Sequence, residues 1–239
     1  MDPITVVIGG EAIALPPITN FAQMNRIWAD VLAVDAAGAD ALEGPVARLR
    51  LIANILVETR PDLTFDVLEG RLRIHLFDGT GETAGLYEPV RRFEVASSFL
   101  PDAGAEPVIP PMAAEPEPGA PIVVVIGGER LTLPPIGNLK QMARIWPAMK
   151  AMDASDDIVR KTAARLALIA GVLAETRPDL TLPELEKRLR PQLYDGTGEI
   201  WGLIEPVHRF LVASGLVAAG EAKPPETPAA EPSNQTGTT

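Results

Sequence analysis

Almost the same sequence occurs twice along this chain of 239 residues. One copy opens with ITVVIGGEAIALPPITNFAQMNRIW at Ile4, and the other opens with IVVVIGGERLTLPPIGNLKQMARIW at Ile122. Shorter strings then recur in the same order in both copies, namely ETRPDLT at Glu58 and Glu175, DGTGE at Asp78 and Asp195, and VAS at Val95 and Val212. A repeated unit of about 95 residues has the length of a domain and exceeds that of a solenoid unit. We therefore expect a tandem pair of homologous domains, residues 1–100 and 122–217.

Two segments outside the repeat have a different composition. Residues 101–121, between the copies, and residues 218–239, after the second copy, are rich in Pro, Ala and Glu. Such segments contain too few apolar side chains to offset the entropy cost of ordering, and proline favours extended backbone. We expect a disordered linker at 101–121 and a disordered tail at 218–239.

Within each copy, the pattern of apolar residues predicts one β-hairpin followed by about four helices. Two glycines, Gly9-Gly10 in the first copy, separate two short strands, and glycine supplies the positive φ angles of a tight turn. Asn20 and its counterpart Asn138 are favourable N-caps for the first helix. The fold class that we expect is mainly α, with two homologous small helical domains that each begin with a β-hairpin.

The first helix of each copy carries an apolar stripe at positions i, i+3, i+7 and i+10. The stripes consist of Phe21, Met24, Trp28 and Val31 in the first copy, and of Leu139, Met142, Trp146 and Met149 in the second. This spacing places the four side chains on one face of a helix. We expect both tryptophans to lie in the core.

Composition excludes several classes of protein. There is no cysteine, which rules out disulfides, thiolate metal sites and cysteine nucleophiles. A formal net charge of -11 disfavours binding to nucleic acid, which depends on clustered Lys and Arg. No apolar run approaches the roughly 20 residues of a membrane span, and the N-terminus lacks the basic and apolar regions of a signal peptide. We expect a cytoplasmic protein that contacts neither nucleic acid nor a membrane.

The sequence contains no recognisable set of catalytic or cofactor-binding residues. The two histidines, His75 and His208, fall at positions that are not equivalent in the two copies, so the copies share no histidine site. The DGTGE string at Asp78 offers oxygen ligands for calcium, but it lacks the alternating acids of an EF-hand loop and the lysine of a P-loop. A glycine turn explains the string more simply. We expect no catalytic residue, no cofactor and no metal site, and hence a protein that is not an enzyme.

Three residues are candidates for binding a partner protein. Arg60 and Arg177 occupy the same place in the two ETRPDLT strings, where proline ends one helix and threonine begins the next. Their guanidinium groups are candidate polar contacts. Trp201 aligns with Ala84, so this tryptophan either fills a local gap or anchors a partner, since tryptophan is enriched at binding hot spots.

The order of these motifs resembles that of the phage tail assembly chaperones. In both copies a GGExxxLPP hairpin, a helix with a tryptophan, an apolar helix that ends in RPDLT and a C-terminal helix with VAS follow one another as in that family. The tandem arrangement departs from the family, which usually has one such domain. The family has no catalytic motif that could be transferred to these residues.

The resemblance implies a non-enzymatic assembly factor of a bacteriophage or prophage. Such a protein would bind the long, helical tape measure protein, keep it soluble and help to recruit the tail tube protein. It would act in the host cytoplasm during assembly and be absent from the mature virion. The alternative is a virion structural protein, either a minor tail component or a head–tail connector component. The sequence leaves the oligomeric state open.

Overall fold

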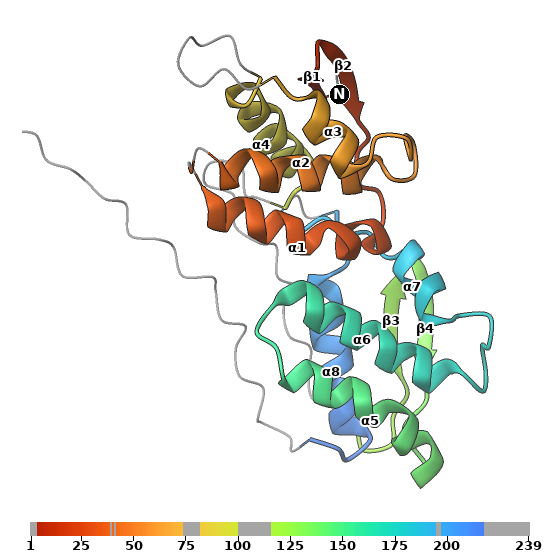
Figure 1. Ribbon diagram of the computed structural model, residues 1–239. Coiled ribbons are helices and arrows are strands. Elements are labelled where there is room, and N and C mark those ends of the chain that lie inside the picture. The colour runs from red at the N-terminus through yellow and green to blue at the C-terminus, as the bar shows by residue number, and fades with distance from the viewer. Residues whose placement is uncertain are drawn as a thin grey trace, which may run out of the picture.

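The computed structural model describes residues 4–38, 40, 42–73, 82–99, 116–194 and 197–217. The described residues form two units, which Figure 1 shows one above the other. We refer to residues 4–99 as the N-terminal unit and to residues 116–217 as the C-terminal unit. Helices dominate both, and each contains one two-stranded antiparallel sheet. The prediction of a mainly helical fold with hairpins is confirmed.

The elements of the two units follow in the same order. The N-terminal unit contains β1 (Ile4–Ile8), β2 (Glu11–Leu15), α1 (Phe21–Ala37), α2 (Glu43–Leu56), α3 (Phe65–Arg71), the 3-10 turn η1 (Ala84–Leu86) and α4 (Tyr87–Ala96). The C-terminal unit contains β3 (Ile122–Ile126), β4 (Glu129–Leu133), α5 (Leu139–Asp153), α6 (Ile158–Leu173), α7 (Leu182–Arg188), the 3-10 turn η2 (Trp201–Leu203) and α8 (Ile204–Ala213). Among the described residues, no helix has the length and apolar content to span a membrane.

Each hairpin turns at its two glycines. Gly9 and Gly10 have φ angles of 63° and 80°, and Gly127 and Gly128 have φ angles of 60° and 78°. Two consecutive positive φ angles define the tight turn that matches the twist of paired strands, and glycine adopts them without steric cost. The strands place alternate side chains, such as Val6 and Ile8, in the core.

The first helix of each unit begins where the sequence predicts. The side chain of Asn20 accepts a hydrogen bond from the backbone N–H of Gln23, and that of Asn138 accepts one from Gln141. These bonds satisfy one of the N–H groups that a helix leaves without a partner at its start. The two asparagines therefore set where α1 and α5 begin.

The two apolar stripes have different environments, and one expectation about them is wrong. In α1, Phe21 is fully buried and Trp28 is half-buried. In α5, however, Leu139 is 81% exposed and Trp146 is 45% exposed, so Trp146 is not a core residue. The difference arises because α1 packs against α6 and α7 of the C-terminal unit, whereas the described residues place no second unit on the corresponding face of α5 (Figure 1).

The predicted linker overlaps the described residues only at its end. Residues 116–121 include a turn in which the N–H of Ala120 donates to the carbonyl of Glu117. The N–H of Gly119 also donates to the carbonyl of Ala213, which attaches this turn to the end of α8. The rest of the predicted linker and the predicted tail at 218–239 lie outside the described residues, as do His75 and Asp78.

Candidate partner-binding surfaces

The two candidate arginines form ion pairs within their own units. Arg60 donates from Nε and Nη2 to the two carboxylate oxygens of Asp62, each over 3.1 Å. Arg177 does the same to Asp179, over 3.1 and 3.0 Å, and its Nη1 reaches Glu129 of β4 over 3.1 Å. A two-pronged guanidinium–carboxylate pair fixes the geometry of both side chains. Arg60 also reaches Glu11 of β2 over 3.4 Å, so in both units the arginine holds the RPD turn in place and attaches it to the hairpin.

These ion pairs lower the pKa values of the two aspartates. The hydrogen bonds from Arg60 hold the pKa of Asp62 below its usual value, and those from Arg177 do the same for Asp179. Both pairs are solvent-exposed, so screening by water and salt keeps their contribution to stability small.

The glutamate of DGTGE has a function that sequence reasoning missed. Glu82 accepts hydrogen bonds from the backbone N–H groups of Gly9 and Gly10, over 2.7 and 2.8 Å, and from that of Arg73 over 3.1 Å. The consecutive N–H groups of such a turn form a small concave site that attracts anions. The carboxylate of Glu82 occupies this site, and therefore connects the hairpin to the segment that precedes η1.

Glu199 makes the same contacts in the C-terminal unit. Its carboxylate accepts from Gly127 over 2.7 Å, from Gly128 over 2.9 Å and from the backbone of Arg190 over 3.2 Å. The glycine pair and the glutamate recur in both copies with the same spacing of about 70 residues, and the same contact forms in both units. The DGTGE string thus serves the fold through its last residue.

Trp201 is positioned as a structural residue. It lies in η2, half-buried and packed against the hydrophobic core. Its indole Nε1 donates a hydrogen bond of 2.7 Å to the carbonyl of Leu193. Of the two interpretations that the sequence left open, this geometry favours the filling of a local gap.

The contact between the two units is made by the outer face of α1. At one end of this face, the backbone N–H of Phe21 donates to the carbonyl of Leu189 over 2.9 Å. At the other end, Trp28 Nε1 donates to Oδ2 of Asp157 over 2.8 Å. The face of α1 therefore spans from the C-terminus of α7 to the N-terminus of α6.

Further contacts support this arrangement. Asn25 Nδ2 donates to Glu186 over 3.4 Å, and the backbone N–H of Leu193 donates to the carbonyl of Ser98 over 3.2 Å. Hydrogen bonds from Arg26 and Gln23 are the main causes that lower the pKa of Glu58, and the charge of Lys187 contributes. The two units thus pack through a defined interface.

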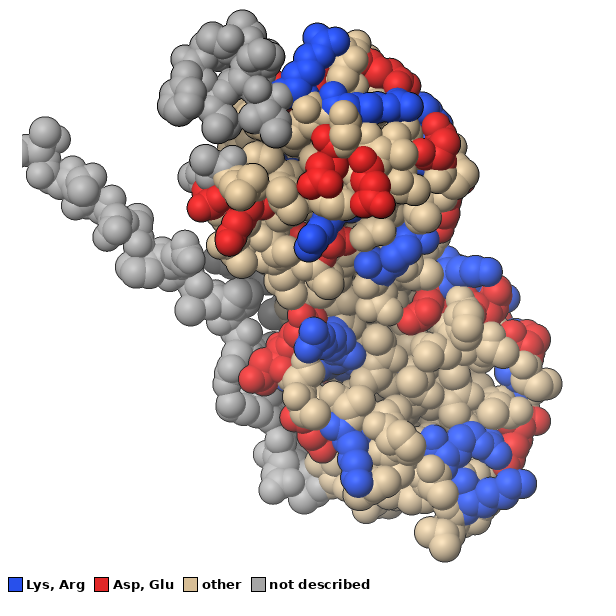
Figure 2. Space-filling model, in the orientation of Figure 1, with Lys and Arg blue, Asp and Glu red and all other residues tan. Residues whose placement is uncertain are grey.

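The corresponding face of α5 is an exposed apolar surface. We define the α5 surface as Leu139, Met142, Trp146 and Met149. Leu139 and Trp146 are among the exposed large hydrophobic residues, and both methionines are half-buried. Figure 2 shows a largely uncharged area in the middle of the C-terminal unit, with basic residues around it. Exposed apolar side chains that lie next to one another on a helix are typical of binding surfaces.

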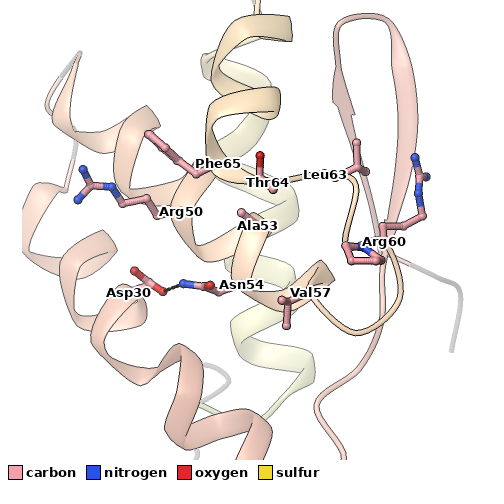
Figure 3. Close-up of a pocket in the computed structure, with 10 residues that line it drawn as sticks. Asp30, Arg50, Ala53, Asn54, Val57, Arg60, Leu63, Thr64 and Phe65 are labelled. Carbon is pink, nitrogen blue, oxygen red and sulfur yellow. Dashed lines mark hydrogen bonds between the residues drawn. The ribbon is translucent and has the colours of Figure 1, made fainter.

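A second candidate surface is a groove between α1, α2 and α3, which we call the N-terminal groove. It has a volume of about 230 Å³ and is lined by Asp30, Arg50, Ala53, Asn54, Val57, Arg60, Pro61, Leu63, Thr64 and Phe65. Figure 3 shows Asn54 and Asp30 joined across the groove, by a hydrogen bond of 2.6 Å. Arg50 lies over the ring of Phe65, 5.2 Å from its centroid. The groove combines apolar walls with polar groups at its margins.

The helices of the C-terminal unit pack differently at the equivalent position. Gly171 and Ala148 stand where the N-terminal unit has Asn54 and Asp30. An added Cβ on Gly171 would lie 3.1 Å from Cγ2 of Ile145, so α5 and α6 are in close contact there. The Asn54–Asp30 pair needs more space than glycine and alanine, and this explains the groove between α1 and α2.

Neither metal-binding groups among the described residues nor similarity to known proteins points to a further candidate site. No group of three or more His, Asp or Glu side chains with the geometry of a metal site occurs among the described residues. No family model matches the chain, and neither a curated protein nor a solved structure matches it significantly.

Proposed function

We propose that this chain is a tail assembly chaperone of a bacteriophage or prophage, built as two homologous domains, 1–100 and 122–217. It binds the tape measure protein, keeps it soluble in the host cytoplasm and assists assembly of the tail tube protein. It acts without a cofactor and is not an enzyme. The basis for this proposal is the ordered set of motifs in both copies, which resembles that family. A net charge of -11 is suited to keeping a complex with an apolar client in solution.

The observation that best supports client binding is the N-terminal groove. Ala53, Val57 and Phe65 offer apolar contacts, while Arg50 supplies positive charge at the margin. A groove of this composition suits an amphipathic helix that carries acidic residues beside its apolar face. Tape measure proteins are expected to be largely helical, so such a segment is the client that we assign to the groove.

The experiment is co-expression of the full chain with the tape measure protein of the same phage or prophage. Val57 is 44% exposed, so Val57→Asp introduces a charge into the groove with little effect on folding. We expect this variant to lower the affinity for the client about tenfold and to leave most of the client insoluble. Val7→Asp is the matched control, because Val7 is 49% exposed and lies on β1, outside the groove.

Two results would contradict the proposal. Equal client solubility with Val57→Asp and Val7→Asp would remove the groove as the binding site. Stoichiometric amounts of this chain in purified virions, measured by mass spectrometry, would instead support the alternative of a minor tail or connector component.

A further inference from the structure

The contact between the two units uses different faces of each. The N-terminal unit contributes the outer face of α1, whereas the C-terminal unit contributes the N-terminus of α6 and the C-terminus of α7. A contact between unlike faces leaves one face of each kind uncovered. These are the α5 surface of the C-terminal unit and the surface of the N-terminal unit formed by the start of α2 and the end of α3, which we call the α2–α3 surface.

The α5 surface matches the face of α1 that makes the internal contact. Leu139 and Trp146 stand at the positions of Phe21 and Trp28 in the repeated sequence. Phe21 is fully buried, whereas Leu139 is 81% exposed. The C-terminal unit therefore presents to solvent the residues that correspond to Phe21 and Trp28, which make the internal contact through a backbone N–H and an indole N–H.

The α2–α3 surface matches the face that receives α1. Asp157, the acceptor for Trp28, has Asp40 as its counterpart. Asp157 accepts from the second and third backbone N–H groups after it, and Asp40 accepts from those of Leu42 and Glu43 over 2.8 and 2.7 Å. Asp40 is exposed, and the neighbouring Leu42 is 71% exposed. An acceptor and an apolar side chain thus lie together at the start of α2.

Charges on the two uncovered surfaces are complementary. Helix α5 carries Lys140 and Lys150, while its third basic residue, Arg144, is paired with Glu175 over 3.1 Å, and its single acid is Asp153. Across the other surface lie Asp40 and Glu43 at the start of α2 and the exposed Glu69 near the end of α3, where Arg71 is the one basic residue. Opposite charges on two surfaces favour their encounter and fix their register.

We propose that the α5 surface of one molecule binds the α2–α3 surface of a second copy of this chain. The intermolecular contact repeats the internal one, with Trp146 facing Asp40 as Trp28 faces Asp157. Because the two surfaces differ, a pair of bound molecules still has one free α5 surface and one free α2–α3 surface. The assembly therefore grows head to tail, either into a closed ring or into an open filament. This proposal goes beyond the chaperone function and does not depend on it.

The experiment measures the mass of the full chain by sedimentation velocity over a range of concentrations. Leu139→Asp disables the α5 surface, and an acid in the first turn of a helix is favourable, so the fold is retained. The double variant Leu42→Asp, Glu69→Lys disables the α2–α3 surface at two exposed positions. Val125→Asp, at an exposed position of β3, is the matched control.

We expect the unmodified chain and Val125→Asp to form species larger than dimers as concentration rises. Each surface variant alone should weaken association at least about tenfold. An equimolar mixture of the two surface variants should form a one-to-one dimer and nothing larger, because the mixture contains one intact pair of surfaces. This dimer is the specific result of a contact between unlike faces.

Either of two results would overturn the inference. One is an unmodified chain that stays monomeric up to about 0.2 mM, because a specific contact between two copies should be detectable at that concentration. The other is a mixture without a one-to-one dimer, including the case in which α5 pairs with itself and the double variant Leu42→Asp, Glu69→Lys dimerises alone. Client solubility measured with Leu139→Asp separates the two proposals, because the N-terminal groove is intact in that variant.

Discussion

The indole nitrogen of Trp28 donates a hydrogen bond to Oδ2 of Asp157 over 2.8 Å, and this bond joins the two units. The same carboxylate accepts through Oδ1 from the backbone N–H groups of Val159 and Arg160. Asp157 therefore caps α6 and receives α1 with different oxygens of one side chain. The ring of Trp28 also meets that of Phe99 edge to face, at a centroid distance of 6.3 Å.

Trp28→Phe should destabilise the protein, whereas Trp146→Phe should not. Phenylalanine keeps most of the apolar area of Trp28 but removes the donor to a charged acceptor, which costs about 1.5–3 kcal/mol. Trp146 is exposed, so its substitution should change the free energy of unfolding by less than about 0.5 kcal/mol. Urea denaturation followed by circular dichroism provides both values. Equal effects of the two substitutions would contradict the described contact between the units.

Glu199→Gln should weaken the attachment of the second hairpin. The glutamine amide keeps one acceptor oxygen, so at least one of the bonds from Gly127, Gly128 and Arg190 is lost or weakened. We expect a loss of about 1–3 kcal/mol in the free energy of unfolding. Glu88→Gln, at an exposed position of α4, is the control and should have little effect. Faster hydrogen exchange of the Gly127 and Gly128 amides would identify the hairpin as the affected part.

Trp201→Phe distinguishes the two interpretations of Trp201. Loss of the Nε1 bond to the carbonyl of Leu193 should lower the free energy of unfolding by about 1–2 kcal/mol. Client solubility should stay unchanged, because the tryptophan is committed to the fold. A variant that keeps full stability but loses the client would instead establish Trp201 as a partner contact.

Glu94 should make stability depend on pH near neutrality. Burial raises the pKa of Glu94 to about 7, and the charge of Asp35 adds to this effect, while the charges of Arg48 and Arg91 oppose it. Its Oε1 has no hydrogen-bond partner among the described residues. The folded-state pKa lies above the unfolded value of 4.5, so the folded chain holds this proton more tightly. The resulting stability is fully present below pH 4.5 and is lost as pH rises through 7.

The measurement is the free energy of unfolding between pH 5 and pH 8, with and without Glu94→Gln. The unmodified chain should lose up to about 3 kcal/mol over the full titration of Glu94, from 1.36 kcal/mol per pKa unit. Glu94→Gln should remove this dependence, because glutamine stays neutral throughout. Leu211 occupies the equivalent place in α8, so the dependence should arise from the N-terminal unit alone. An undiminished loss in the glutamine variant would show that another group causes it.

The sequence by itself determined the local structure of this protein. Each hairpin turns at the glycine pair because only glycine adopts two positive φ angles without cost. Helices α1 and α5 begin after Asn20 and Asn138 because those side chains supply the missing N–H partners. The mainly helical class followed from the 3.6-residue spacing of apolar positions. All of these depend on interactions between residues close in sequence.

Only the tertiary structure decided how the repeated motifs are used. The stripes of α1 and α5 have the same spacing, yet Phe21 is buried and Leu139 is exposed, because burial depends on what packs against a helix. The function of Glu82 and Glu199 likewise depends on glycines that lie about 70 residues away in sequence. A periodic pattern identifies an apolar face, but the partner of that face is set by contacts between distant segments. For that reason the sequence predicted the elements, and the structure was needed to find the α5 surface and the N-terminal groove.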